Sequence, residues 1–330
     1  MVTASSLLVA LTLPIAVVRC SGNNDALDRA RALTPPLANS TIDGEDEGES
    51  FWRGSKDVID RAWRTAYSPK HPSLFRFDDQ FRTLYLDQDF DKAVQELRGG
   101  NAGVDREMEI EAQIVSLFEE VHPGVLRSDK IFSNAFVEEL LEELGEFDGT
   151  GIPLRRPNGM NRYGVIVEDV AGGIPTLAES FGKLIQSHLR PLSETLFPES
   201  VGSDDAKDHF AFTVRYKLGE DLELKEHRDA SVLTINLCLG QPGFKGSELY
   251  FVDPTTGERK YLEHKPGAIL IHRGGLRHSA LPLKRGSRTN LIVWLFGEDG
   301  YVRDAEYGPE ERMTPSQRWR RERVASHEEL

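Results

Sequence analysis

The segment EHRDASVLTIN, residues 226–236, places a histidine and an aspartate two positions apart at the start of an apolar run. In an extended strand, side chains at positions i and i+2 point to the same face, so His227 and Asp229 can reach one ion. A second histidine, His278, stands at the start of a later strand-like run. Two imidazoles and one carboxylate suit a divalent iron and leave coordination positions open. The pattern therefore predicts a metal site built from these three residues.

Other interpretations of these histidines compete with the metal site. HRD also opens the catalytic loop of protein kinases, but that loop needs Asn five residues after the aspartate, where this chain has Thr234. Any one of the nine histidines is more often a surface or core residue than a ligand. His272, in ILIHRGG, is a rival for the second histidine ligand, whereas we interpret His209 and His264 as structural.

An arginine, Arg288, follows His278 by ten positions and precedes the strand-like run TNLIVWLFG. A guanidinium there can hold the far carboxylate of a dicarboxylic co-substrate through two hydrogen bonds. Taken alone, Arg288 would be interpreted as a surface charge on a strand. Its spacing to His278, which is shorter than its spacing to His272, favours His278 as the distal ligand.

The composition limits the classes of protein that the chain can belong to. A length of 330 residues allows one large domain or two modest ones, and 39% hydrophobic and 28% charged residues are typical of a soluble globular protein. The net charge of −14 argues against nucleic-acid binding through a broad basic face. With only Cys20 and Cys238, the chain has no disulfide framework and no multi-cysteine metal site.

The N-terminal residues 1–20 contain an apolar segment over 7–18. It is too short to span a bilayer comfortably and has the length of the central region of a signal peptide, although no Lys or Arg precedes it. We expect a signal peptide and a location in the secretory pathway, in the endoplasmic reticulum lumen or secreted. An uncleaved membrane anchor and a plastid presequence are the alternatives. Residues 21–50 are polar and acidic and predict a disordered linker.

Residues 51–150 predict a mostly helical N-terminal region. Apolar residues recur at three- and four-residue spacings over 54–67 and 105–122, and a helix over 133–145 begins after a Ser cap and stops at Gly145. A further helix is predicted over 176–197, kinked or divided by Pro191.

From residue 209 the pattern changes to short runs rich in β-branched and aromatic residues, separated by Gly, Pro and Asp. The runs are 209–216, 231–239, 247–253, 259–264, 267–272 and 289–297. Short strands without helices between them predict an antiparallel sandwich or barrel. The expected fold class is therefore α+β, with a double-stranded β-helix (jelly-roll) core and supporting helices, followed by a charged C-terminal tail over 301–330.

The runs around HRD, together with KPGAILIHRGGLRHSALPLKRGSR and the upstream RRPNGMNRYGV, resemble iron(II)- and 2-oxoglutarate-dependent dioxygenases of the prolyl- and lysyl-hydroxylase branch. Within that branch the chain is most similar to the 2-oxoglutarate and iron-dependent oxygenase domain-containing proteins. The resemblance covers residues 151–300. It departs from many prolyl hydroxylases at Leu224, where they carry a tyrosine, and at Gly246-Ser247, where two glycines are usual.

The resemblance implies a set of site residues. His227, Asp229 and His278 would bind Fe(II), Arg288 would bind the distal carboxylate of 2-oxoglutarate, and Tyr216 would face this co-substrate. It also implies an oxidoreductase that hydroxylates a C–H bond of a peptidyl proline or lysine and releases succinate and CO2, with ascorbate as reductant.

The expected partner is thus a peptide or protein substrate, with no nucleic acid, and a membrane only if the N-terminal segment is an uncleaved anchor. The segment PNGMNRYG, within 155–165, is either a substrate-side loop or a turn into a strand. Two alternatives stay open: a non-catalytic jelly-roll module that binds a metal or a peptide, and a cupin-like metal enzyme that does not use 2-oxoglutarate. The second would leave Arg288 without a partner.

Overall fold

The computed structural model describes residues 21–35, 41–42, 45–100, 103–198, 200–201, 209–240 and 243–296. The predicted signal segment and the predicted C-terminal tail lie outside these ranges. In the part of the chain that is described, no helix has the length and apolar character needed to cross a membrane.

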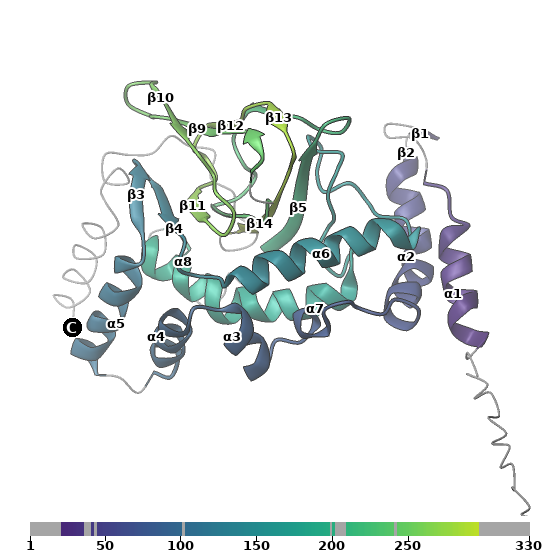
Figure 1. Ribbon diagram of the computed structural model, residues 1–330, viewed down its shortest axis with the longest axis horizontal. Helices are drawn as coiled ribbons and strands as arrows, with labels where there is room; N and C mark the ends of the chain where they lie inside the picture. The colour runs from purple at the N-terminus through teal and green to yellow at the C-terminus, as the bar shows by residue number, and fades with distance from the viewer. Residues whose placement is uncertain are drawn as a thin grey trace, which may run out of the picture.

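Two antiparallel sheets form the predicted jelly roll, and helices lie together beneath it (Figure 1). The larger sheet has the strand order β3-β4-β11-β7-β14-β5, and the smaller has the order β10-β9-β12-β6. The strands are β1 Thr41–Ile42, β2 Glu45–Asp46, β3 Glu119–His122, β4 Val125–Ser128, β5 His209–Lys217, β6 Leu224–His227, β7 Leu233–Cys238, β8 Lys245–Gly246, β9 Leu249–Val252, β10 Arg259–Leu262, β11 Ile269–Arg273, β12 His278–Ala280, β13 Leu283–Arg285 and β14 Ser287–Leu295. Each of the six predicted runs contains a strand, and the α+β fold class is confirmed.

Side chains of β7 point alternately to the helical layer and to the interior of the barrel. Leu233, Ile235 and Leu237 belong to the large core that the sheet shares with the helices. Thr234 and Asn236, at the positions between them, line a cavity inside the barrel. Successive side chains of a strand point to opposite faces, so one strand can serve both layers. A second core fills the barrel interior and includes Phe212, Val214, Tyr216, Leu249 and Phe251.

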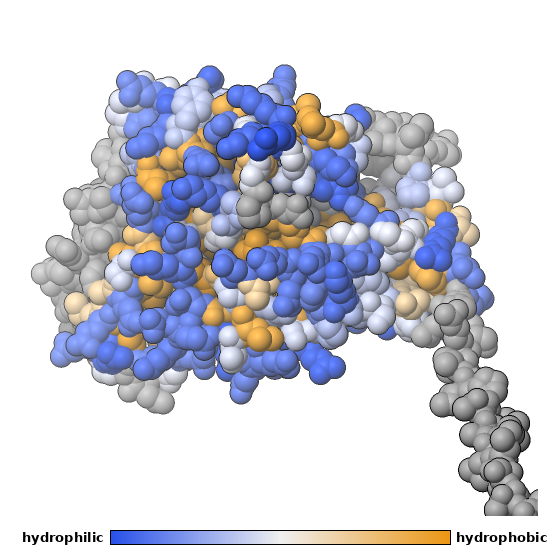
Figure 2. Space-filling model, in the orientation of Figure 1, coloured by the Kyte–Doolittle hydropathy of each residue, from blue (hydrophilic) through white to orange (hydrophobic). Residues whose placement is uncertain are grey.

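The helical layer covers the outer face of the larger sheet (Figure 1). Its elements are α1 Ser21–Arg31, α2 Glu47–Thr65, the 3-10 turn Pro72–Phe75, α3 Asp79–Tyr85, α4 Gln88–Arg98, α5 Val104–Ser116, α6 Asn134–Thr150, α7 Pro175–Leu184, the π-helical turn Ile185–Leu189 and α8 Arg190–Leu196. The face of the molecule in Figure 2 is mostly hydrophilic, with small hydrophobic patches between the barrel and the helices.

Helix α6 confirms the predicted Ser cap and corrects the predicted end. Ser133 Oγ accepts a hydrogen bond from the N–H of Phe136 at 3.2 Å, as an N-cap does. The helix passes through Gly145 and ends at Gly151, whose φ of 72° is the left-handed conformation that closes helices. Burial of Phe147 beyond Gly145 explains the extra turn.

The predicted helix over 105–122 is wrong in its last third, 117–122. Helix α5 ends at Ser116, and the following residues form the hairpin β3-β4, which joins the larger sheet beside β11. Gly124, with a φ of 74°, forms the tight turn between the two strands. Pairing of β3 with β4, which in turn pairs with β11, outweighs the helical spacing that continues through Val121, so the N-terminal region contributes strands to the barrel.

The predicted disordered linker over 21–50 is also wrong at its start, because helix α1 occupies Ser21–Arg31. Ala26 and Ala30 are buried, one helical turn apart, on the helix that packs against α2. The Nε of Arg31 donates a hydrogen bond to the carbonyl of Thr150 at 2.7 Å, at the C-terminal end of α6. Two small apolar residues and one capping arginine therefore order a segment that its acidic composition would leave disordered.

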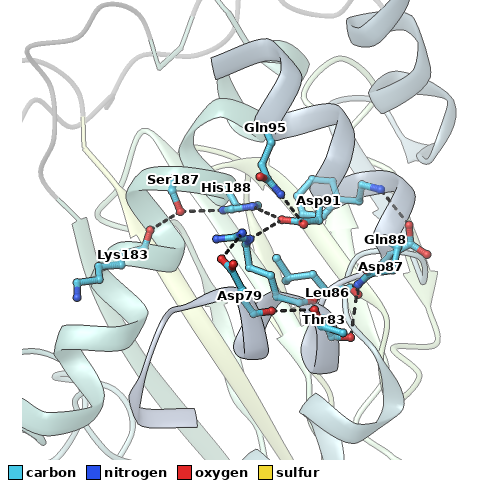
Figure 3. A network of polar contacts seen from close by, with 12 residues as sticks. Asp79, Thr83, Leu86, Asp87, Gln88, Asp91, Gln95, Lys183, Ser187 and His188 are labelled. Carbon is cyan, nitrogen blue, oxygen red and sulfur yellow. Dashed lines mark hydrogen bonds and ion pairs between the residues drawn. The ribbon is translucent and has the colours of Figure 1, made fainter. Parts of the chain in front are cut away.

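Pro191 divides its helix as expected, and the turn before it carries a buried polar network (Figure 3). Proline lacks an N–H, so the preceding residues shift to the wider π-helical hydrogen bonding. His188 in this turn contacts Asp91 Oδ1 through Nε2 at 2.8 Å and Ser187 Oγ through Nδ1 at 2.7 Å. Gln95 Nε2 donates to Asp91 Oδ2 at 2.6 Å. The network joins α4 to the helix that lies under the barrel.

We expect Asp91→Ala to lower the free energy of unfolding by about 3 kcal/mol, because it leaves the buried His188 without its acceptor. Lys92→Ala is the matched control, since the Lys92 side chain is 76% exposed, and it should change stability by less than about 0.5 kcal/mol. Urea unfolding at pH 7 measures both values. Equal effects of the two substitutions would contradict a stabilising role for the network.

The outer edge of β5 is covered by residues 163–167, and the half-buried Glu168 follows them. Its Oε1 accepts a hydrogen bond from the N–H of Ala211 at 2.6 Å. Burial raises the pKa of Glu168 to about 7, against the opposing effect of this hydrogen bond. The fold therefore favours the neutral acid.

A raised pKa in the fold means that stability falls as pH rises from about 4.5, the unfolded value, to about 7, where the folded group ionises. We expect Glu168→Gln to be more stable than the natural chain by on the order of 2 kcal/mol at pH 8 and equal to it at pH 4.5. Thermal unfolding of both proteins from pH 4.5 to pH 8 measures this difference. Substitution of the exposed Glu146 by Gln is the control. A pH-independent difference would contradict the assignment.

Candidate metal and co-substrate site

The two predicted histidine ligands are neighbours on paired strands of the smaller sheet. His227 ends β6, His278 begins β12, and the register places them directly opposite each other. Their ring centroids lie 4.3 Å apart. Cross-strand partners share a face of the sheet, so both imidazoles point into the barrel. The pairing explains how two histidines that are distant in sequence meet.

Asp229 reaches the histidines in a different way from the one expected. The strand predicted to carry both His227 and Asp229 ends at His227, and Asp229 lies two residues beyond it. Its N–H donates to the carbonyl of Gly274 at 2.9 Å, and its Oδ2 accepts from Thr234 Oγ1 at 2.6 Å. These two hydrogen bonds turn the carboxylate toward the imidazoles.

The three side chains present their donor atoms to one point. One donor atom from each lies within 4.8 Å of the others. The Nε2 atoms of His227 and His278 are 3.3 Å and 3.7 Å from the Asp229 oxygens. Each Nδ1 faces a backbone carbonyl, that of Lys225 at 2.7 Å or that of Leu276 at 3.0 Å. An N–H at Nδ1 leaves the lone pair of each Nε2 free for a metal.

Electrostatics favour the protonation states that a metal ligand needs in His278 and Asp229, whereas in His227 burial is outweighed by the hydrogen bond to Asp229, which raises the pKa of that imidazole. Burial lowers the pKa of His278 to about 3, so its imidazole is neutral at physiological pH. Burial opposes the ionisation of Asp229, yet the surrounding imidazoles hold its pKa below its usual range. A carboxylate and a neutral imidazole are the forms that coordinate metals. The residues present therefore fit a divalent ion such as iron(II).

His272, the rival ligand, is fully buried on β11 and lies close to the site. Its Nε2 is 3.9 Å from Asp229 Oδ2, and its ring centroid is 4.7 Å from that of His278. It is not among the residues that line the cavity, whereas His227, Asp229 and His278 are. The geometry thus favours His278 over His272 as the second histidine ligand.

A cavity of about 200 Å³ opens beside the three donors, and Arg288 lies at its wall. Arg288 is 1% exposed and stands directly opposite Tyr216 in the pairing of β14 with β5. Its guanidinium carbon is 5.0 Å from the centre of the Tyr216 ring. The predicted co-substrate residues therefore lie together, in the same cavity as the predicted metal ligands.

The Arg288 guanidinium lacks a counter-ion among the described residues. Its Nη1 donates to the carbonyl of Ser247, and its Nε has no partner. Burial lowers the pKa of Arg288, because a charge removed from water is costly unless an opposite charge balances it. An anion in the cavity would supply that balance.

The cavity also contains residues that sequence reasoning missed. Thr234 and Asn236 alternate on β7, and Asn290 follows Arg288 at the same spacing on β14. Polar residues at every second position of an apolar strand were the available signal. In the segment within 155–165, Asn158 and its neighbours line the cavity, and the residues after them pair with β5, as a turn into a strand would. A contact of this segment with substrate stays a prediction.

Comparison with known proteins finds a family model and several relatives. Residues 64–202 match the family model of the OGFOD2-like domain. The human 2-oxoglutarate and iron-dependent oxygenase domain-containing protein 2 is 40% identical over 170 residues, which are 50% of this chain and 47% of that protein. The 2-oxoglutarate and iron-dependent oxygenase domain-containing protein CP2 of Arabidopsis thaliana is 30% identical over 70% of this chain and 56% of its own length.

A more distant relative is procollagen-lysine,2-oxoglutarate 5-dioxygenase 1 of Mus musculus, 28% identical over 48% of this chain and 22% of that protein. The chain spans about half the length of the first relatives. All three names contain 2-oxoglutarate, and those of the human and Arabidopsis proteins also contain iron. The cavity holds side chains suited to both. Over about half of its length, the chain is therefore similar to proteins named as 2-oxoglutarate- and iron-dependent oxygenases.

Proposed function

We propose that the protein is an iron(II)- and 2-oxoglutarate-dependent dioxygenase that hydroxylates a C–H bond of a peptidyl proline or lysine and releases succinate and CO2. The observation that carries this proposal is the buried Arg288, which has no counter-ion among the described residues, in the same cavity as the His227, Asp229 and His278 donors. A ligand that chelates a metal at one end and bears a carboxylate at the other would satisfy both features.

Each part of the cavity has a defined task under this proposal. His227, Asp229 and His278 would hold the iron from one side, which leaves its cavity side to the co-substrate and dioxygen. Arg288 and Tyr216 would orient the distal carboxylate and thereby fix the chelating end. Bound iron supplies the activation of dioxygen and the oxidation of the C–H bond. Burial of the site excludes water from the reacting groups.

The substrate class is supported by one relative and by the cavity wall. The name of the mouse relative states that it acts on a lysine of procollagen. The cavity wall away from Arg288 includes Phe212, Ile292 and Trp294, which would pack against an aliphatic side chain. Ascorbate as the reductant, and a secretory location based on the apolar segment 7–18, complete the proposal.

The test is succinate production from 2-oxoglutarate with iron, ascorbate and a library of proline- and lysine-containing peptides, followed by mass spectrometry for a gain of one oxygen atom. We expect peptide-dependent succinate and an oxidised proline or lysine. Tight zinc binding without affinity for 2-oxoglutarate would overturn the proposal in favour of a non-catalytic metal-binding module.

A further inference from the structure

The loop between α6 and α7 places one fully buried amide in the co-substrate cavity. Asn161 is 1% exposed and lines the cavity with Tyr216 and Arg288. Its Nδ2 has no hydrogen-bond partner among the residues that the structure describes. A buried N–H group without an acceptor is costly, so its retention at a cavity wall indicates an acceptor that arrives with a ligand.

The direction of this amide follows from its neighbour Asn158. The Oδ1 of Asn158 accepts hydrogen bonds from the backbone N–H groups of Met160 and Asn161, both at 2.8 Å. The other end of Asn158 is therefore its donor, and this Nδ2 lies 3.2 Å from Asn161 Oδ1. Because that contact engages the oxygen of Asn161, its Nδ2 must point the other way.

The backbone around Asn161 is held in place on its C-terminal side. The N–H of Arg162 donates to Asp221 Oδ2 at 2.7 Å, and the carbonyl of Tyr163 accepts from the N–H of Arg215 on β5 at 2.9 Å. Asn161 and Tyr216 line the same cavity. Tyr216 in turn faces Arg288.

We propose that Asn161 Nδ2 donates a hydrogen bond to the distal carboxylate of 2-oxoglutarate beside Arg288, and that Asn158 is the positioning residue that sets its direction. This inference rests on the proposed function and deepens it. A guanidinium supplies the charge for the carboxylate, and the amide supplies a second, directional donor from a different element. Co-substrate binding would thereby connect the loop to the barrel.

Calorimetric titration of the manganese-loaded protein with two ligands tests the proposal without turnover. The ligands are 2-oxoglutarate and 2-oxopentanoate, which has the same chelating end and chain length but no distal carboxylate. We expect Asn161→Leu to weaken 2-oxoglutarate binding about tenfold, the loss typical of one hydrogen bond to a charged group, and 2-oxopentanoate binding less than twofold. Asn161→Asp should weaken 2-oxoglutarate binding further, because the aspartate has the same charge as the distal carboxylate. This variant replaces Asn161→Leu in the test if the leucine variant does not fold.

The Asn158→Ala variant adds a coupling measurement. It should weaken 2-oxoglutarate binding, but by less than Asn161→Leu does. The double variant should bind 2-oxoglutarate no more weakly than Asn161→Leu alone. Arg162→Gln, an exposed neighbour in the loop, is the matched control and should leave binding within about twofold. Equal losses for the two ligands, or no loss for either, would overturn the role of Asn161. Failure of the unaltered protein to bind 2-oxoglutarate would overturn the proposed function as well.

Discussion

Replacing Arg288 with methionine is expected to weaken 2-oxoglutarate binding at least about a hundredfold without destabilising the protein. The two effects have one cause. Arg288 is a buried cation with no counter-ion among the described residues, so removing its charge also removes a desolvation cost. Methionine keeps most of the length and packing of the side chain. We therefore expect the ligand-free variant to unfold at the same or a higher temperature.

Thermal unfolding with and without 2-oxoglutarate measures both effects, since a bound ligand raises the unfolding temperature. The natural chain should be stabilised by the co-substrate and the Arg288→Met variant should not. Arg285→Met, an exposed arginine near the start of β14, is the matched control and should keep the ligand response. A large loss of stability in ligand-free Arg288→Met would show that the arginine supports the fold instead of the co-substrate.

Asp229→Ala is expected to lower iron-dependent conversion of 2-oxoglutarate to succinate by at least about a thousandfold. The alanine removes the only carboxylate of the three-donor site and leaves two neutral imidazoles, which hold a divalent ion poorly. Metal content after dialysis against iron(II) gives a second measurement that does not depend on turnover.

Glu226→Gln is the matched control for Asp229, because both are carboxylates at the end of β6. Glu226 pairs with Arg259 and Arg277 at the partly exposed surface and does not line the cavity. Its substitution should leave both metal content and succinate formation unchanged. If Asp229→Ala retained iron, the assignment of the carboxylate ligand would be wrong.

The sequence was most informative where the chemistry is carried by residue type and spacing. His227, Asp229, His278 and Arg288 were predicted from those features together with the family resemblance, and the structure brings them to one cavity. Asn161 could not be assigned a direction, because that depends on hydrogen bonds within its loop. Strand register also lies outside local sequence, since it is set by pairing between distant segments.

The incorrect secondary-structure predictions share a physical cause. Residues 105–122 have helical spacing throughout, but the last of them pair with β4, which extends the sheet from the edge of β11, and so become a strand. The start of the predicted linker folds because two alanines meet α2 and an arginine caps α6. In both segments a tertiary contact outweighs the local preference of the residues. A short window of sequence does not contain that contact.

The β3-β4 hairpin makes the oxygenase barrel inseparable from the helical region that precedes it. A fragment beginning at residue 151 would retain all the site residues, yet it would leave the edge of β11 without its neighbour β4 and the large core without helices α2 to α6. Strand β11 would then become an exposed edge of the sheet, and such an edge can pair with other chains. Catalytic chemistry and folding thus have different boundaries in this protein: half the chain contains the reacting groups, but only a longer part can fold around them.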